Sequence, residues 1–288
     1  MLSLTVLAPA KVNLILKVLG RRSDGYHELF TLFHRISLCD RLTFKRIDRP
    51  KFRLVVQGAK LGRVHNNLIY QAYRLLGKLA RWKGGVEVVL EKKIPHAAGL
   101  GGGSSDAAHF LLGMNQFLKL DLSRKTLLKL GMQLGSDVPF FLYGVNQAIG
   151  TGRGEKVKGL PSKNKRWFVL LIPPFKISTP MVYKAFDRLA LTRISRFATI
   201  TSVLSNKNKT DWPYAFLEND LYPASCIVRP KLKQFETLFK ELGSKQWLMS
   251  GSGSAMFGVY KSKPEAQNAV QMIRRRSPKG SIFICHTC

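Results

Sequence analysis

The chain has 288 residues, of which 45% are hydrophobic and 22% charged, and it carries a formal net charge of +30. This length favours two domains, and the composition is that of a globular protein, which excludes a disordered or membrane-embedded chain. Such a charge attracts polyanions, but the basic residues are spread along the chain and form no long basic arm. A solvated basic surface is therefore favoured over a specific nucleic-acid site.

The four cysteines are Cys39, Cys226, Cys285 and Cys288. They are too few and too scattered for a disulfide scaffold, which fits a reducing compartment. Cys285 and Cys288 resemble half of a zinc site, but no second pair is present to complete four ligands. No apolar run approaches the roughly 20 residues that span a membrane. We expect a cytoplasmic protein without a membrane partner.

Strands and helices alternate in the first part of the chain, which predicts an α+β fold. Period-two and β-branched runs indicate strands, and apolar residues at helical spacing indicate helices. A turn-rich segment at 20–25 interrupts the first strands. The expected strands are 2–7, 12–18 and 86–94, and the expected helices are 67–82, 106–118 and 122–134.

The polar, turn-prone stretch at 161–166 is the best candidate for a linker. It divides the chain into an N-terminal domain, residues 1–160, and a C-terminal domain, residues 161–288. The second domain again mixes both kinds of element. Its expected strands are 167–172, 255–260 and 282–285, and its expected helices are 181–189, 231–242 and 264–275.

The clearest chemical signal is the glycine-rich loop at residues 95–105, between a predicted strand and a predicted helix. It matches neither the Walker A pattern nor the dinucleotide fingerprint. Its glycines permit positive φ and let backbone N–H groups approach a ligand, and the helix N-terminus that follows attracts anions. A flexible loop that only caps the helix is the alternative, but four glycines carry an entropic cost that favours a function. The expected ATP-binding residues are Pro95, His96, Ala97, Ala98, Gly99, Leu100, Gly101, Gly102, Gly103, Ser104 and Ser105.

Two further glycine clusters, at 150–155 and 250–254, are typical of tight turns where backbone approaches another group closely. Each alone is weak. Three such clusters in one chain favour a phosphate-handling cleft shared by two domains.

Other short motifs are distributed over the whole chain. They are APAKVNL at 8–14, DGYHEL at 24–29, GSDVPFF at 135–141, ENDL at 218–221 and MSGSG at 249–253. With the glycine loop, these runs resemble the GHMP kinase superfamily in the expected order. The resemblance implies two α+β domains, the first similar to domain 2 of ribosomal protein S5 and the second ferredoxin-like, with the active site between them.

The same resemblance implies that Lys11 and Asp137 form the catalytic pair. An aspartate can orient an acceptor hydroxyl and accept its proton, and an ammonium nearby steadies developing charge. A surface lysine and a helix-capping aspartate would be the interpretation without the family context. Phosphoryl transfer also implies Mg²⁺, and analogy with the superfamily makes Ser105 a candidate ligand.

The DGYHEL and GTGRGE runs resemble one branch of the superfamily in particular. Its acceptor is the 2-hydroxyl of a cytidine-diphosphate-linked methylerythritol used in isoprenoid precursor synthesis. The resemblance implies substrate contacts by Asn13, Tyr26, His27 and Tyr183, with the last three forming a cytosine slot in which aromatic rings stack and His27 hydrogen-bonds the base edge. The chain departs from the pattern of this branch at two positions. Phenylalanine is common at the position of Tyr183, and an acidic residue is common at the position of Tyr222.

Two alternatives stay open. Another kinase of the superfamily, acting on mevalonate, homoserine or a sugar, would differ only in its acceptor pocket. A basic RNA-binding protein would suit the charge and an S5-like domain, but no RNP-type motif, KH loop or zinc knuckle is visible.

Overall fold

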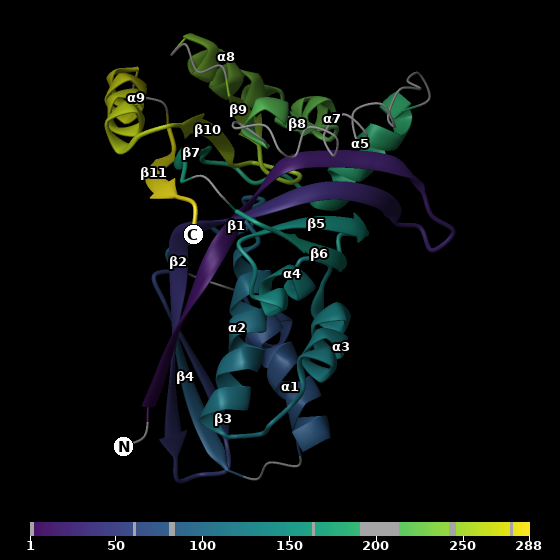
Figure 1. Cartoon of the computed structure of the whole chain (residues 1–288), viewed down its shortest axis with the longest axis vertical. Coiled ribbons are helices and arrows are strands. Elements are labelled where there is room, and N and C mark those ends of the chain that lie inside the picture. The colour runs from purple at the N-terminus through teal and green to yellow at the C-terminus, as the bar shows by residue number, and fades with distance from the viewer. Residues whose placement is uncertain are drawn as a thin grey trace.

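The computed structural model describes residues 3–59, 62–80, 84–162, 165–190, 213–241, 246–276 and 279–288. Within these residues, helices pack on two separate β-sheets (Figure 1). The predicted two-domain α+β class is confirmed. No described helix is long and apolar enough to cross a membrane.

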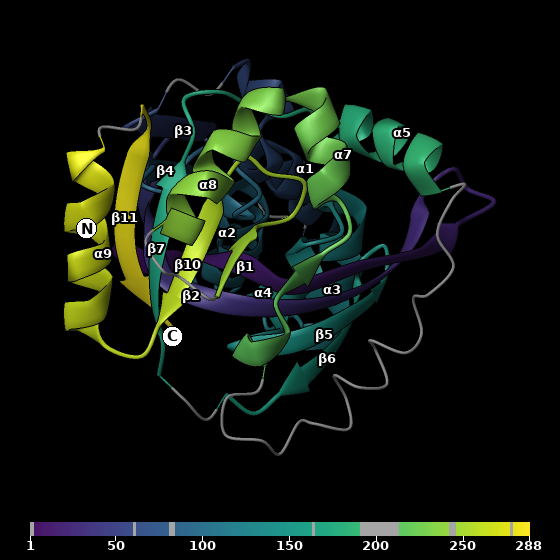
Figure 2. The same cartoon turned by 90° about the horizontal axis from the view of Figure 1, so that it is seen from above.

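Two long strands organise the larger sheet: β1, Ser3–Arg21, and β2, His27–Ile47, pair antiparallel along nearly their whole length. The prediction of two short strands was wrong, because 2–7 and 12–18 belong to one strand. Its register shifts after Pro9, and such an irregularity tolerates a residue that has no N–H to donate. The hairpin turn between β1 and β2 reaches toward α5, Thr179–Ala190, in Figures 1 and 2.

The larger sheet has the order β3-β4-β2-β1-β8, with β5 paired to β2 and β6 paired to β5. The helix after the glycine loop begins at Gly102, earlier than the predicted residue 106. The sequence analysis missed β5 and β6 because their glycines and lysines are poor strand formers. The elements are β3 Phe52–Gln57, η1 Val64–Asn66, α1 Leu68–Ala80, β4 Gly85–Glu91, α2 Gly102–Phe117, α3 Arg124–Leu134, α4 Val138–Tyr143, β5 Gln147–Gly152, β6 Lys156–Leu160 and β8 Glu218–Asn219.

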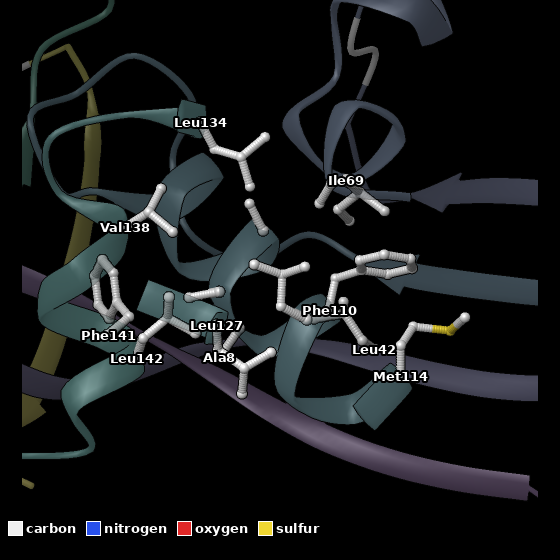
Figure 3. Packing of buried hydrophobic residues seen from close by; sticks show 14 of the residues in the cluster. Ala8, Leu42, Ile69, Phe110, Met114, Leu127, Leu134, Val138, Phe141 and Leu142 are labelled. Atoms are coloured by element: carbon white, nitrogen blue, oxygen red, sulfur yellow. The ribbon is translucent and has the colours of Figure 1, made fainter. Parts of the chain in front are cut away.

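A continuous apolar core joins these helices to the sheet. Phe110 and Met114 of α2 lie near Leu42 of β2 and Ile69 of α1, and Val138 of α4 belongs to the other side of the same cluster (Figure 3). All five side chains are essentially inaccessible to solvent. This packing fixes α2 and α4, the two helices whose N-termini border the glycine loop and Asp137, on a rigid base.

The second sheet has the order β11-β7-β10-β9, with antiparallel neighbours throughout. The predicted strands and helices of this half are confirmed in type, with ends shifted by a few residues. The predicted linker falls between β6 and β7, and residues 163 and 164 within it lie outside the described residues. The elements are β7 Trp167–Ile172, η2 Tyr214–Phe216, α7 Tyr222–Val228, η3 Pro230–Leu232, α8 Lys233–Glu241, β9 Trp247–Met249, β10 Met256–Tyr260, α9 Lys263–Arg275 and β11 Ser281–His286.

The two halves are not separate along the chain. β8 lies after the predicted boundary at residue 160 but joins the larger sheet, where Asn219 pairs in parallel with Leu16 of β1. Asn219 also donates from its side chain to the carbonyls of Met249 and Gly251, at 2.7 and 2.8 Å. This buried amide therefore ties the 250–254 turn to the larger sheet.

Candidate active site

A cavity of about 1020 Å³ lies where the two halves meet. Its walls come from β1, the start of β2, the glycine loop, the start of α4, α5 and the 250–254 turn. These segments are distant in the sequence, and the fold brings them to one place. The predicted catalytic and substrate-binding residues all line this cavity: Lys11, Asn13, Tyr26, His27, Asp137 and Tyr183.

The glycine loop has the left-handed backbone that its composition predicts. Gly99 and Gly101 have φ of 81° and 67°, and Ala97, at 56°, adopts the same region without being glycine. The loop is held from the C-terminal half, because Ser250 Oγ donates to the Gly99 carbonyl at 2.8 Å. A Cβ at Gly99 would lie 2.1 Å from the Ser250 carbonyl oxygen, so only glycine fits there.

Only part of the loop faces the cavity. Ala97, Gly99, Gly101 and Ser104 line it. Ser105 is fully buried, and its hydroxyl donates to the Pro9 carbonyl at 2.7 Å. The remaining predicted ATP-binding residues lie in the loop or the first turn of α2 but not in the cavity lining: Pro95, His96, Ala98, Leu100, Gly102 and Gly103.

Lys11 and Asp137 meet inside the cavity, with Nζ and Oδ2 3.4 Å apart. The lysine side chain is only 5% exposed, whereas that of Asp137 is 31% exposed and accessible to a substrate. Lys11 also donates to Asn13 Oδ1 at 2.6 Å, and the amide of Asn13 donates in turn to Thr31 Oγ1 at 2.7 Å. This chain of contacts orients the ammonium toward the carboxylate.

The residues of the predicted cytosine slot line the same cavity. The His27 ring stacks on Tyr183, with centroids 4.7 Å apart and planes inclined by 24°. Tyr26 is 55% exposed, and the guanidinium of Arg153 lies 4.7 Å from its ring centre. Burial, followed by the charge of Asp137, raises the pKa of Tyr183, so its phenol stays neutral. One face of Tyr183 is thus already covered by His27.

A buried ionic cluster supports the loop from behind. Lys92 Nζ donates to Asp40 and, at 2.7 Å, to Asp106 on the first turns of α2. All three side chains are nearly inaccessible to solvent. Burial raises the pKa of Asp106 to about 7, although Lys92 acts in the opposite direction. The sequence analysis did not single out these residues, because nothing in their spacing pairs them.

Asp187 and Arg153 were also missed. Asp187 contacts His27, and Arg153 covers Tyr26. For Asp187 a signal did exist, since it follows Tyr183 by four residues and so lies on the same face of α5.

Comparison with known proteins agrees with this geometry. A family model described as GHMP kinases N terminal domain matches residues 67–145, and one described as GHMP kinases C terminal matches residues 216–279. A 4-diphosphocytidyl-2-C-methyl-D-erythritol kinase of Citrifermentans bemidjiense is 38% identical over 275 residues, 96% of each chain. The protein of the same name from Listeria welshimeri serovar 6b is 37% identical over 274 residues, 95% of this chain and 93% of its own.

Solved structures extend the comparison. The crystal structure of a 4-(cytidine 5'-diphospho)-2C-methyl-D-erythritol kinase superposes with a TM-score of 0.80 at 35% identity, covering 99% of each chain. A homoserine kinase from Cytophaga hutchinsonii superposes with a TM-score of 0.74 at 16% identity, covering 99% of this chain and 94% of its own, and shares only the fold.

The chain has two α+β halves, a glycine loop at a helix N-terminus and a Lys–Asp pair in the cleft between the halves. These features define a small-molecule kinase of the GHMP class. Sequence identity above 30% over nearly the whole chain identifies the family within this class. The chain belongs to the 4-diphosphocytidyl-2-C-methyl-D-erythritol kinase family.

Proposed function

We propose that this chain transfers the γ-phosphate of ATP to the 2-hydroxyl of 4-diphosphocytidyl-2-C-methyl-D-erythritol, a step toward isoprenoid precursors. The observation that carries the proposal is the contact of 3.4 Å between Lys11 and Asp137, in the same cavity as the glycine loop and the aromatic cluster. The names of full-length relatives support this choice of acceptor. The charged, soluble reactants favour the cytoplasm as its location.

The chemistry follows from the charges at the pair. Asp137 would orient the acceptor hydroxyl and take its proton as the oxygen attacks the γ-phosphorus and the bond to ADP breaks. Lys11, which donates to Asn13, is positioned to offset negative charge on the transferring group. Backbone N–H groups of the glycine loop at the start of α2 would hold the other phosphates. The site therefore supplies positioning and charge stabilisation.

Mg²⁺ is the metal that transfer from ATP implies, and it would neutralise charge on the phosphates. It prefers oxygen ligands and takes only one or two from the protein when phosphates supply others. Asp137 and Ser104 both present oxygens to the cavity, so the residues fit such an ion. The predicted ligand Ser105 is fully buried and lies outside the cavity lining, which makes Ser104 the better candidate.

The cytidine end of the substrate would serve as a handle. The base would be held by Tyr26, His27 and Tyr183. The binding energy of these contacts, which lie far from the reacting hydroxyl, would then keep that hydroxyl aligned with the γ-phosphate. Removing the cytidine should then lower kcat as well as affinity.

The test is a coupled ADP-release assay with five acceptors: the cytidine substrate, its uridine analogue, free methylerythritol phosphate, mevalonate and homoserine. We expect the highest kcat/KM for the cytidine substrate and a marked loss with the uridine analogue. Preferred turnover of mevalonate or homoserine would assign the chain to a different acceptor. Equal use of the cytidine and uridine compounds would remove the cytosine slot.

A further inference from the structure

The ring of His27 is clamped by one face of α5. Nε2 of His27 lies 2.6 Å from Oδ1 of Asp187, and the ring stacks on Tyr183, one helical turn earlier. Phe186 packs edge-on against the same ring, with centroids 6.3 Å apart and planes at 88°. His27 belongs to β2, so a helix of the C-terminal half fixes a side chain of the N-terminal half.

The carboxylate partner decides which nitrogen carries the proton. An ionised carboxylate only accepts, so Nε2 of His27 is the donor in this contact. In a neutral imidazole the other nitrogen, Nδ1, is then a bare acceptor. Within the described part of the chain, Asp187 is the only side chain that hydrogen-bonds to the ring, and His27 lines the cavity. Nδ1 is therefore available to a ligand.

We propose that Asp187 is a positioning residue that sets the base specificity of the enzyme through His27. With the proton held on Nε2, Nδ1 accepts from the exocyclic amine of cytosine. Uracil carries a carbonyl at the same place, which would set one lone pair against another and leave both without a donor. The inference rests on the proposed function, because it needs His27 to face the base. Asp187 also lines the cavity, but its proposed role is exerted through His27.

Three variants isolate this role. Asp187→Ala removes the acceptor, and Asp187→Asn offers an amide whose NH₂ can donate to Nε2 and so shift the proton to Nδ1. Asp48→Ala is the matched control, because Asp48 is an exposed residue outside the cavity lining and its loss changes the net charge equally. We expect Asp187→Ala to lower the preference for the cytidine over the uridine substrate, as a ratio of kcat/KM, by about tenfold or more. Asp187→Asn should lower the preference as well, because the amide no longer forces the proton onto Nε2, and Asp48→Ala should keep it.

The KM of ATP separates positioning from damage to the fold. A structural defect would raise the KM of ATP and depress both acceptors alike, whereas loss of the proton assignment changes only the choice between bases. A cytidine preference that survives in Asp187→Ala overturns the proposal. A loss of preference in Asp48→Ala equal to that in Asp187→Ala would also overturn it, since net charge and not the contact with His27 would then matter.

A second measurement needs no substrate. Long-range ¹H–¹⁵N spectra of histidine-labelled protein report which ring nitrogen bears the proton. They are recorded at about pH 8.5, which is above the ordinary histidine pKa. We expect His27 to carry it on Nε2 in the parent and to show mixed tautomers in Asp187→Ala. A proton on Nδ1, or on both nitrogens, in the parent contradicts the assignment.

The two measurements distinguish two kinds of failure. If the parent does not phosphorylate the cytidine substrate, the proposed function fails, and the spectra alone decide whether Asp187 positions His27. If the parent does so and Asp187→Ala keeps the base preference, the inference about Asp187 fails while the proposed function stands.

Discussion

Asp137 is the residue on which the proposed chemistry depends most directly. Its carboxylate is accessible from the cavity and lies 3.4 Å from Lys11, which has Asn13 as a second partner. In Asp137→Asn the lysine keeps that partner, so the fold should be retained. The acceptor hydroxyl, however, loses its proton acceptor, and we expect kcat to fall by about 10² to 10⁴-fold.

The measurement is single-turnover phosphoryl transfer, with ATP affinity followed in parallel. Asp48→Asn, an exposed change of the same kind, is the control and should be silent. Near-normal turnover by Asp137→Asn would remove this residue from the mechanism.

Asp106 should make stability depend on pH. Burial raises its pKa from an ordinary 3.8 to about 7. A carboxyl whose pKa is higher in the folded state stabilises the fold when protonated, so its contribution is fully present below about pH 3.8 and is lost as the pH rises through about 7. Asp106→Asn mimics the protonated form at every pH.

The pH dependence is tested by urea unfolding of the parent and of Asp106→Asn without nucleotide. Both proteins are measured at about pH 5 and about pH 8. The parent should lose on the order of 2 kcal/mol relative to the variant between these two values. If the free energy of unfolding changes equally with pH in the parent and in Asp106→Asn, Lys92 keeps Asp106 ionised throughout.

Among the structural elements, the glycine loop is one of those that join both halves of the molecule. Gly99 has φ of 81°, and an added Cβ would lie 2.1 Å from the Ser250 carbonyl oxygen. We expect Gly99→Ala to push the loop away from the 250–254 turn, to reduce the free energy of unfolding by roughly 1–3 kcal/mol and to weaken ATP binding.

Gly77→Ala in α1 provides a matched control, because no atom lies within 4 Å of the added Cβ and the backbone there is ordinary helix. Alanine should leave nucleotide binding unchanged and stabilise the helix by up to about 1 kcal/mol. Calorimetric titration with an ATP analogue measures the binding. Equal affinities in the two variants would show that the loop does not grip the nucleotide through its docking on Ser250.

At the scale of the whole molecule, the net charge of +30 exceeds anything the active site requires. The basic residues are dispersed, and no base-reading motif accompanies them, so contacts to RNA would involve phosphates alone. Binding should then be weak, indifferent to sequence and steeply reduced by salt. Fluorescence anisotropy with two unrelated RNAs, at about 50 and 200 mM salt, measures all three properties. Nanomolar binding of only one of them at the higher salt would favour the RNA-binding alternative.

The local features of this protein could be predicted from its sequence. Amphipathic spacing identified the longer helices but not the short α4 and α7. The composition of residues 95–105 predicted a left-handed, phosphate-binding loop, because backbone conformation depends on the residue itself. The motif around Asp137 became informative only through resemblance to a family, since one aspartate has no periodicity to reveal its role.

Only the tertiary structure decided which distant segments meet. It joined the first two predicted strands into β1, placed β8 in the larger sheet and brought Lys11 within 3.4 Å of Asp137. It also showed that Asp187 holds His27. Such contacts join segments far apart in the sequence and arise from packing across the whole core, which no local pattern of residues encodes.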